Sequence, residues 1–347
     1  MARIFTWTGR GGDIGQAALL KIFTKSRIQG ALPGLSYVAA MGGYCISLNS
    51  FGASAGLDLG SAKSEIYLGF RLMRTSHYTG DSVLEFILGS TSLANFRITG
   101  AGQSTPRFPR FAVYSGHSGT WLANSSIVPF LNNKVDTAYV EVYYKPAASG
   151  GRWVVKVNGR TVMDFTGDTV PGSESTLDTV HFGTGLYTND IYFYYNDIVV
   201  DDADWPGMCQ MAQLSPNGAG NYAQWVPSVS PNWDCVDECP PSKTDFNKTN
   251  TADDSDSFSV ADLPGEAVTV NGVSVWVWGL KENAPTPTQI KPLVRTGSTP
   301  TDYLGSGVTA GVYDTFISGF WAVNPYTSQP WSLAEVNGME IGVKSAA

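Results

Sequence analysis

Charged side chains are scarce in this sequence. Asp, Glu, Lys and Arg together make up 15% of its 347 residues, against about a quarter in an ordinary globular protein. The formal net charge is −8, and the nearest approach to a basic cluster is the pair Arg107 and Arg110. Because nucleic-acid binding depends on clustered cations that neutralise phosphates, the composition argues against a nucleic-acid partner.

Long apolar runs are also missing. The sequence has no stretch of 18 consecutive apolar residues, so it predicts no membrane-spanning helix and no membrane partner. Residues 1–13 carry a charge at Arg3 but lack the continuous apolar region of a signal peptide. We therefore expect synthesis in the cytoplasm without export through a leader.

Cysteine and histidine are rare, with four and three residues. Cys209, Cys235 and Cys239 lie close together in sequence, but they lack the paired spacing and nearby histidines of a zinc site. A disulfide from Cys209 to one of the later two and free thiols remain equal alternatives. No cofactor motif is found.

Two acidic groups offer hard oxygens that calcium could bind, but neither has the spacing of a calcium-binding loop. Solvated acidic loops are therefore the favoured interpretation. The two groups are Asp253, Asp254 and Asp256, and Asp197, Asp201 and Asp202.

Glycine and aromatic residues are abundant, and apolar residues alternate with others in short runs. In residues 64–72 the alternation places Ile66, Leu68, Phe70 and Leu72 on one face of a strand. Asn158-Gly159 predicts a hairpin turn, because both central positions of that turn need positive φ. Further strands are expected at residues 82–88, 93–98, 110–114, 152–157 and 160–165. The pattern predicts an all-β sandwich or barrel.

The sequence predicts three parts: a β domain over residues 1–203, an extended but docked connector over 204–257, and a smaller antiparallel β domain over 258–347. Trp225, Trp233 and Phe246 indicate that the connector is docked, because flexible linkers rarely carry large apolar groups. Residues 13–29 fit a short helix, with a strand as the alternative. In the last part, Ser332 and Glu335 have capping-box spacing and predict one helical turn.

Catalytic patterns are hard to find. Glycoside hydrolysis needs two carboxylates facing each other, whereas Glu65, Glu85 and Glu141 each stand alone on their strands. His117 lies between glycines, and a loop histidine without chemistry is the favoured interpretation. We therefore predict no enzymatic activity.

Several aromatic residues are candidates for an interface or for stacking on a glycan: Trp121, Tyr187, Trp276, Trp278 and Trp321. Alternation places Trp276 and Trp278 on the face opposite Val273, Val275 and Val277. We favour a subunit contact for this pair.

The block over residues 138–202 resembles a concanavalin A-like, laminin-G-type jelly roll, and the resemblance extends over residues 1–203. The segments that carry it are residues 139–143, 155–159, 164–168, 178–183 and 195–200. It implies a two-sheet sandwich. Glucanases share this fold, but the Glu-x-Asp-x-x-Glu strand that they carry is not found in the sequence.

Residues 205–347 resemble the region that follows such domains in virion proteins of tailed bacteriophages. The matching segments are residues 204–207, 232–241, 290–297 and 324–337. The resemblance implies a non-enzymatic virion component, assembled in the host cytoplasm, bound to other virion proteins and homo-oligomeric. The position in tail, fibre or head stays open. The alternative is a carbohydrate-binding fibre or adhesin that recognises a host surface glycan.

Overall fold

A computed structural model gives the fold of the chain as two compact units. One comprises Met1–Arg10 and Gly15–Met211, and the other comprises Gly11–Ile14 and Ala212–Ala347. The structure describes residues 3–7, 34–38, 43–48, 54–74, 82–99, 110–117, 119–126, 137–184, 193–209, 212–229, 231–238, 242, 244–265, 267, 269–281, 287–310 and 315–347. The helix predicted within residues 13–29 lies outside these ranges.

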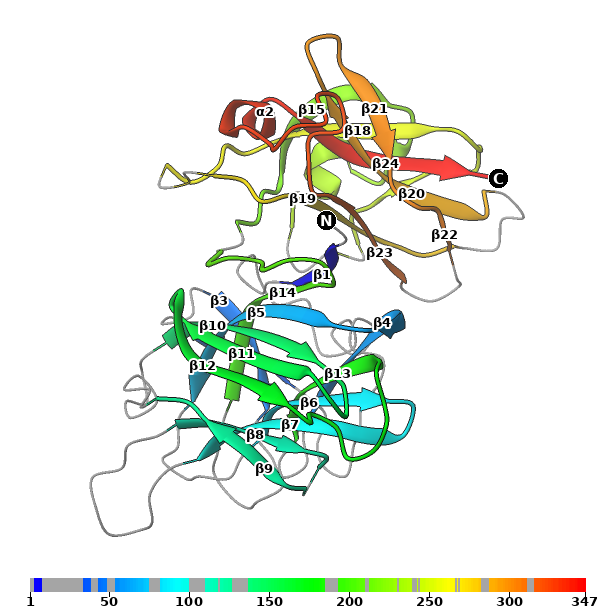
Figure 1. The fold of residues 1–347 in the computed structure, drawn as a ribbon. Helices are drawn as coiled ribbons and strands as arrows, with labels where there is room; N and C mark the ends of the chain where they lie inside the picture. Colours follow the sequence, from blue (N-terminus) through cyan, green and yellow to red (C-terminus); the bar gives the residue numbers. More distant parts are fainter. Residues whose placement is uncertain are drawn as a thin grey trace. The chain divides into compact units, whose positions relative to one another are not determined.

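The first unit is a sandwich of two antiparallel sheets (Figure 1). The eight-stranded sheet runs β12 (Arg160–Gly167), β11 (Gly151–Val157), β10 (Thr137–Lys145), β5 (Ile66–Arg74), β14 (Phe193–Asp201), β3 (Gly43–Leu48) and β2 (Gly34–Val38), with β1 (Arg3–Trp7) also paired to β14. The six-stranded sheet runs β4 (Ala55–Lys63), β13 (Leu177–Thr184), β6 (Ser82–Leu88), β7 (Thr91–Thr99), β8 (Arg110–Ser115) and β9 (Trp121–Asn124). This arrangement confirms the jelly-roll sandwich that the sequence predicts.

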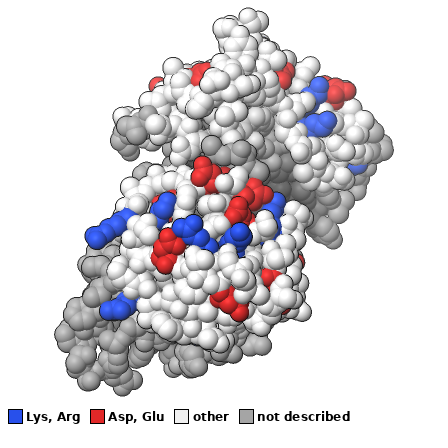
Figure 2. Space-filling view, in the orientation of Figure 1, with Lys and Arg blue, Asp and Glu red and all other residues white. Residues whose placement is uncertain are grey.

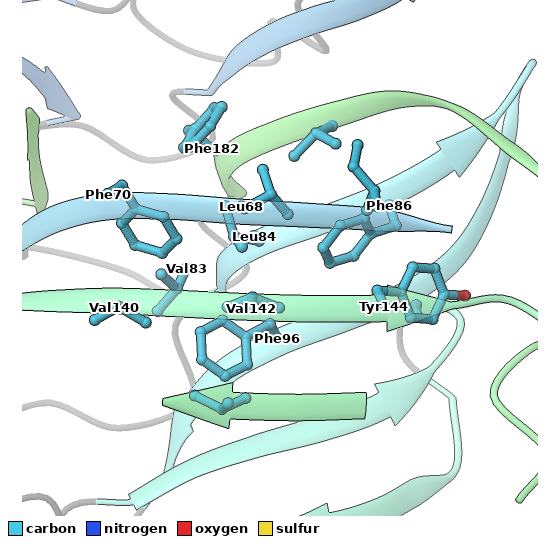
Figure 3. Packing of buried hydrophobic residues seen from close by; sticks show 14 of the residues in the cluster. Leu68, Phe70, Val83, Leu84, Phe86, Phe96, Val140, Val142, Tyr144 and Phe182 are labelled. Atoms are coloured by element: carbon cyan, nitrogen blue, oxygen red, sulfur yellow. The ribbon is translucent and has the colours of Figure 1, made fainter. Parts of the chain in front are cut away.

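The core lies between the two sheets. Ile66, Leu68, Phe70 and Leu72 of β5 are all fully buried, as the alternation predicts, and they pack with side chains of the facing sheet such as Phe86. Figure 3 shows these aliphatic and aromatic groups meeting from both layers. Removing this apolar surface from water supplies about 25 cal/mol for each Å² buried, so the alternating strands are stable only when stacked.

The hairpin between β11 and β12 turns at Asn158 and Gly159. Their φ angles are 47° and 78°, so both central residues occupy the left-handed region that the sequence predicts for this turn. The Asn158 Oδ1 atom also accepts the backbone N–H of Tyr139 at 2.9 Å. The turn therefore fixes the register of β11 and β12 and ties the hairpin to β10.

The second unit is a smaller antiparallel β structure. Its main sheet runs β15 (Pro216–Ala223), β18 (Ser255–Val260), β24 (Glu340–Ala346), β20 (Gln289–Thr296) and β21 (Thr301–Leu304), with β22 (Val308–Thr309) also paired to β20. Two ribbons complete it, β16 (Val226–Pro227) with β17 (Asn247–Lys248), and β19 (Val273–Gly279) with β23 (Thr315–Trp321). A short 3-10 helix spans Asn232–Cys235.

The predicted helical turn is α2 (Leu333–Asn337), and its capping box is present. Ser332 accepts the backbone N–H of Glu335, and the Glu335 side chain accepts the backbone N–H of Ser332. In the described part of the chain, no helix is long and apolar enough to cross a membrane.

The segment predicted as a connector is divided between the two units. Residues 204–209 belong to the first unit, whereas β15 and the start of β18 are strands of the second unit's main sheet. Trp225 belongs to the second unit too, where it packs against the small apolar cluster of Ile290, Ala310 and Val343.

Candidate functional site

Residues 204–209, which we call the strap, pack on the outer face of the eight-stranded sheet over β5, β10 and β11. The Trp205 ring lies 5.5 Å from the Tyr67 ring and 6.2 Å from the Tyr143 ring, measured between centroids. The Nζ atom of Lys156 lies 3.5 Å from the centroid of the Trp205 ring. At the other end of the strap, Cys209 Sγ lies 2.9 Å from the Tyr139 hydroxyl. The part of this face formed by Tyr67, Tyr139, Tyr143 and Lys156 is therefore in contact with the strap.

Glu141 lies beneath the strap and is only 2% exposed. Burial raises the pKa of its carboxyl group, while the positive charge of Lys156 and a hydrogen bond from the backbone of Gly207 act in the opposite direction. Its Oε1 atom has no hydrogen-bond partner. Glu141 is thus a buried acid held by the strap, and it has no second carboxylate opposite it on the neighbouring strands, where it pairs with Lys156 and Gly69.

The outer face of the six-stranded sheet carries a row of polar and aromatic residues that crosses five strands. The strand register places His181 of β13 opposite Glu85 of β6, and Glu85 opposite Asn95 of β7. The row continues from Asn95 to Tyr114 of β8 and from Tyr114 to Trp121 of β9. We call these five residues the polar row.

Two further side chains connect members of the polar row. His117 lies in the turn after β8, and its Nδ1 atom is 2.8 Å from Glu85 Oε1. Arg97 of β7 donates from Nε to Asn95 Oδ1 at 2.9 Å and from Nη2 to the backbone carbonyl of His117. Its guanidinium carbon lies 4.4 Å from the centroid of the Tyr114 ring. The loop and three strands are thereby joined in one network.

Asn95 lies at the centre of this network. One polar atom of its side chain has no hydrogen-bond partner. It is fully buried, and its Oδ1 accepts from both Ser82 Oγ, at 2.7 Å, and Arg97 Nε. Because an arginine Nε can only donate, the amide oxygen is identified and Nδ2 must be the amino group. Nδ2 has no acceptor in the structure. Leaving a buried donor unpaired costs free energy, so Asn95 is an exception among the hydrogen-bonded side chains of this network.

Exposure increases along the polar row toward β9. His181, Glu85 and Asn95 are buried, Tyr114 is half-buried, and Trp121 is 53% exposed. Trp121 is one of the aromatic residues predicted from the sequence, and its Nε1 donates to Asn124 Oδ1 at 3.1 Å. The row therefore offers a flat apolar ring at its exposed end and fixed polar groups toward its buried end.

The other predicted aromatic residues lie elsewhere. Tyr187 is outside the described residues. In the second unit, Trp276 is 38% exposed, and Val273 and Val275 are buried on the opposite face of β19. Trp278 shares the face of Trp276 by alternation. Trp321 packs against the second unit's apolar cluster, and its carbonyl accepts from Trp331 Nε1 at 3.0 Å.

Sequence reasoning missed most of the polar row. The sequence predicts Glu85 as an isolated acid and His117 as a loop histidine, whereas the structure places His117 Nδ1 2.8 Å from Glu85 Oε1. A local signal exists: Glu85, Asn95 and His181 are each a polar residue with an apolar or aromatic residue on both sides along a buried strand. Such residues are rarely tolerated in a sandwich unless they are hydrogen-bonded.

Thiols and acidic residues in the described part of the chain do not form a metal site. No group of three or more His, Cys, Asp or Glu residues there is placed to hold a metal ion. Cys45, Cys209 and Cys235 are not disulfide-bonded, and Cys239 lies outside the described residues.

The carboxylates considered for calcium have protein partners. Asp197 pairs with Arg71 and Asp202 with Lys63, while Asp201 accepts the backbone N–H groups of residues 203 and 204. In the second unit, Asp256 accepts from the Trp225 backbone and from Asn232.

Comparisons with known proteins give weak likenesses. No family model and no curated protein sequence matches the chain. Among solved structures, the alginate lyase Aly36B is 16% identical with a TM-score of 0.43, covering 58% of this chain and 97% of that one. A legume lectin-like domain from Entamoeba histolytica is 10% identical with a TM-score of 0.38, covering 59% and 99%. A tetrameric galectin from the ball sponge Cinachyrella sp. is 11% identical with a TM-score of 0.30, covering 42% and 96%.

Proposed function

We propose that the first unit is a carbohydrate-binding module and that its site is the polar row on the six-stranded sheet. The observation that carries the proposal is the exposed Trp121 ring at one end of a row of polar side chains that hydrogen bonds hold in place. A sugar ring presents an apolar C–H face and a set of hydroxyl groups. An aromatic ring provides area for the first, and fixed polar groups orient the second.

Binding without hydrolysis is part of this proposal. The five residues of the polar row include a single carboxylate, Glu85, and it lies opposite Asn95 on one side and His181 on the other. A glycosidase of the usual kind needs two carboxyl groups across the bond that is cleaved. Incubation of the purified chain with the glycans that it binds, followed by an assay for new reducing ends and for unsaturated products, tests this point. Turnover of any of them would contradict it.

The surface charge is compatible with a glycan partner. Figure 2 shows acidic and basic side chains interspersed with wide uncharged areas on the face in view, and no extended patch of one sign.

The test is glycan binding by the full chain and by two tryptophan variants. We expect the wild type to bind a subset of an array of host polysaccharides and oligosaccharides. Trp121→Ala removes the exposed ring of the polar row and should weaken binding by roughly five- to thirtyfold, about 1–2 kcal/mol. Trp276→Ala removes an exposed ring from the second unit and should leave binding unchanged. Binding that depends on Trp276 instead of Trp121, or no binding to any glycan, would contradict the proposed site.

We further propose that this module belongs to a structural protein of a tailed-bacteriophage virion, in contact with other virion proteins and present as a homo-oligomer. The support is the sequence resemblance of residues 204–207, 232–241, 290–297 and 324–337 to such proteins. A glycan-binding sandwich on a virion would recognise the host surface. Electron microscopy of virions labelled with an antibody to this chain tests the location. Unlabelled particles from a phage that encodes the chain would rule it out.

A further inference from the structure

We infer that His117 is a ligand-contacting residue of the proposed glycan site. Its Nε2 atom accepts a hydrogen bond from a sugar hydroxyl while the ring is neutral, and it pairs with a sugar carboxylate when the ring is protonated. The preference of the site should therefore move from neutral toward acidic sugars as pH falls. This inference rests on the proposed function, to which it adds one contact and the dependence of that contact on pH.

The position of His117 makes it accessible from solvent. The residue lies in the turn between β8 and β9, whose strands pair Tyr114 with Trp121. The His117 side chain is 37% exposed, and Trp121 is 53% exposed. The His117 ring contacts Glu85 of β6, which is three strands away from β9 and so roughly 14 Å from it. A ligand that contacts both Trp121 and His117 needs no cavity, but it needs several sugar units.

Hydrogen bonds fix both the backbone and the ring of His117. Its carbonyl accepts from Arg97 Nη2, and its Nδ1 atom lies 2.8 Å from Glu85 Oε1. The backbone N–H of the preceding residue, Gly116, donates to the Leu93 carbonyl of β7 at 2.7 Å. A side chain that is held in this way loses little conformational freedom on binding, which favours affinity. His117 is therefore preorganised for a ligand.

The pairing with Glu85 determines the role of the other ring nitrogen. An ionised carboxylate can only accept a hydrogen bond, so a neutral His117 ring paired with it carries its hydrogen on Nδ1 and presents Nε2 as an acceptor. Within the described part of the chain, Nε2 has no hydrogen-bond partner and is not buried. A sugar hydroxyl can donate to this atom. Once the ring is protonated, Nε2 becomes a charged donor, which suits a carboxylate.

Charged and titratable groups on the neighbouring elements also act on the His117 ring. Those that contacts and strand register bring near it are Glu85 on β6, Arg97 on β7, Tyr114 on β8, His181 on β13, and Asp168 and Glu174 in the loop that passes Gly116 through Pro171. Together they set the pH at which the ring is protonated. The experiments follow that pH directly.

Contact with a ligand must change how readily the His117 ring takes up a proton. A hydroxyl that donates to Nε2 and a neutral sugar that excludes water both favour the neutral ring, whereas a nearby carboxylate favours the charged ring. Protonation and binding are linked reciprocally, so the same factor appears in the affinity for the glycan. Neutral and acidic sugars should therefore move the titration of His117 in opposite directions.

The first experiment follows the His117 titration by NMR in the full wild-type chain, free and saturated with a glycan. The probes are short oligosaccharides of dextran, mannan and arabinan, which are neutral, and of alginate and polygalacturonate, which are acidic. A neutral probe that binds should move the titration midpoint to lower pH, and an acidic probe that binds should move it to higher pH. Each change should correspond to about a twofold or larger change in proton affinity. An unchanged midpoint, or movement in any other direction, would overturn the inference.

The second experiment removes Nε2 and keeps the contact with Glu85. In His117→Asn the amide nitrogen takes the place of Nδ1, so a donor to Glu85 remains. We expect the affinity for a neutral probe at about pH 8 to fall roughly three- to tenfold. In the wild type an acidic probe should bind about threefold or more tightly near pH 5.5 than near pH 8, and this difference should vanish in His117→Asn. Trp276→Ala is the control that should keep both the affinity and its pH dependence.

The inference and the proposed function fail in different ways. Binding that requires Trp121 but leaves the His117 titration unchanged would overturn the inference and leave the proposed function standing. A folded His117→Asn variant with the affinity and pH dependence of the wild type would have the same meaning. The NMR titration uses the wild type alone, so it decides the matter even if His117→Asn does not fold. Binding of none of the five probes would count against both.

Discussion

Among the polar side chains of the first unit that are almost completely removed from water are Glu85, Asn95 and His181 on one sheet and Glu141 on the other. Each costs free energy unless hydrogen bonds replace those lost with water. Different contacts offset this cost on the six-stranded and the eight-stranded sheet. Glu85 and His181 have hydrogen-bond partners in His117 and Ser54, and Asn95 Nδ2 is a buried donor without an acceptor. Glu141 is held by a hydrogen bond from the Gly207 backbone of the strap.

Replacing Glu141 with glutamine tests the cost of this buried acid. Burial raises the pKa of Glu141 above its ordinary value of 4.5, so the charged form destabilises the fold at pH 7. Below about pH 4.5 the group is protonated in both folded and unfolded chains, and the penalty disappears. Glutamine keeps an oxygen for the Gly207 backbone. We expect Glu141→Gln to be more stable than the wild type at pH 7, by on the order of 1 kcal/mol, with the difference shrinking as pH falls.

Urea unfolding at several pH values measures this, and Asp164→Asn on the same sheet is the matched control. The pKa of Asp164 is lowered by its hydrogen bonds with Arg152, so its stabilising effect is present above its ordinary value of 3.8 and is lost as pH falls further. Asp164→Asn should therefore be slightly less stable than the wild type at pH 7, with the opposite pH trend. A Glu141→Gln variant that is less stable than the wild type at pH 7 would show that Lys156 outweighs burial.

Among the elements, the hairpin of β11 and β12 depends most on one backbone conformation. Gly159 has φ 78°, where a side chain costs about 1–2 kcal/mol. A Cβ atom there would meet only the Met208 side chain, at 3.5 Å or more, so the cost is conformational rather than steric. We expect Gly159→Ala to lower the free energy of unfolding of the first unit by about 1–2 kcal/mol, measured by urea unfolding. Gly265→Ala, at a glycine of the second unit with open space and no positive φ, should change the free energy of unfolding of that unit by less than about 0.5 kcal/mol.

The capping box of α2 gives a second prediction at the scale of elements. Ser332→Ala removes the side-chain acceptor for the Glu335 N–H and should destabilise the second unit by about 1 kcal/mol.

The hydrogen bonds from the Ser332 backbone and hydroxyl lower the pKa of Glu335 below its ordinary value of 4.5. The contribution of the Glu335 charge is therefore present above pH 4.5 and lost as pH falls through the lowered value. Thermal unfolding of Glu335→Gln should show a deficit at pH 7 that shrinks as pH falls through the lowered pKa of Glu335, and a deficit independent of pH would contradict this.

The same elements show what the sequence could predict and what it could not. Alternation along β5 and the Asn158-Gly159 turn depend on neighbours in the chain, and both predictions are confirmed. The polar row depends on the pairing of β13 with β6 and of β6 with β7, which brings His181 beside Glu85 across nearly a hundred residues. Periodicity identifies the face of each residue but not the strand that lies beside it. Glu85 and His117 therefore looked unrelated in the sequence.

At the scale of the whole molecule, the described residues give each of the two units a main apolar cluster of its own. The first unit is organised around the large cluster between its sheets, and the second around a smaller cluster that includes Val275, Val294 and Trp331. Each unit therefore has its own source of stability. The boundary between them matters for any attempt to isolate the proposed glycan-binding module. A boundary at residue 203 follows the strand pattern, whereas a boundary at residue 211 keeps the strap.

The two boundaries predict different behaviour of the isolated first unit. A chain ending at residue 211 keeps Trp205 on Tyr67, Tyr143 and Lys156, and it should unfold cooperatively and retain the glycan affinity of the full chain. A chain ending at residue 203 uncovers Tyr139, Glu141 and Tyr143, which are all buried beneath the strap. We expect it to lose about 2 kcal/mol or more of stability and to bind a hydrophobic dye.

Urea unfolding is measured for both truncated chains and for two full-length point variants. It shows whether a loss of stability comes from the lost packing of the strap or from the shorter chain. Trp205→Ala should reproduce much of the loss, about 2 kcal/mol, because the indole supplies both the aromatic contacts and the partner of Lys156. Trp121→Ala, at an exposed tryptophan of the same unit, should leave stability nearly unchanged. If the chain ending at residue 203 is as stable as the chain ending at residue 211, the strap does not stabilise the sandwich, and the burial of Glu141 must come from elsewhere.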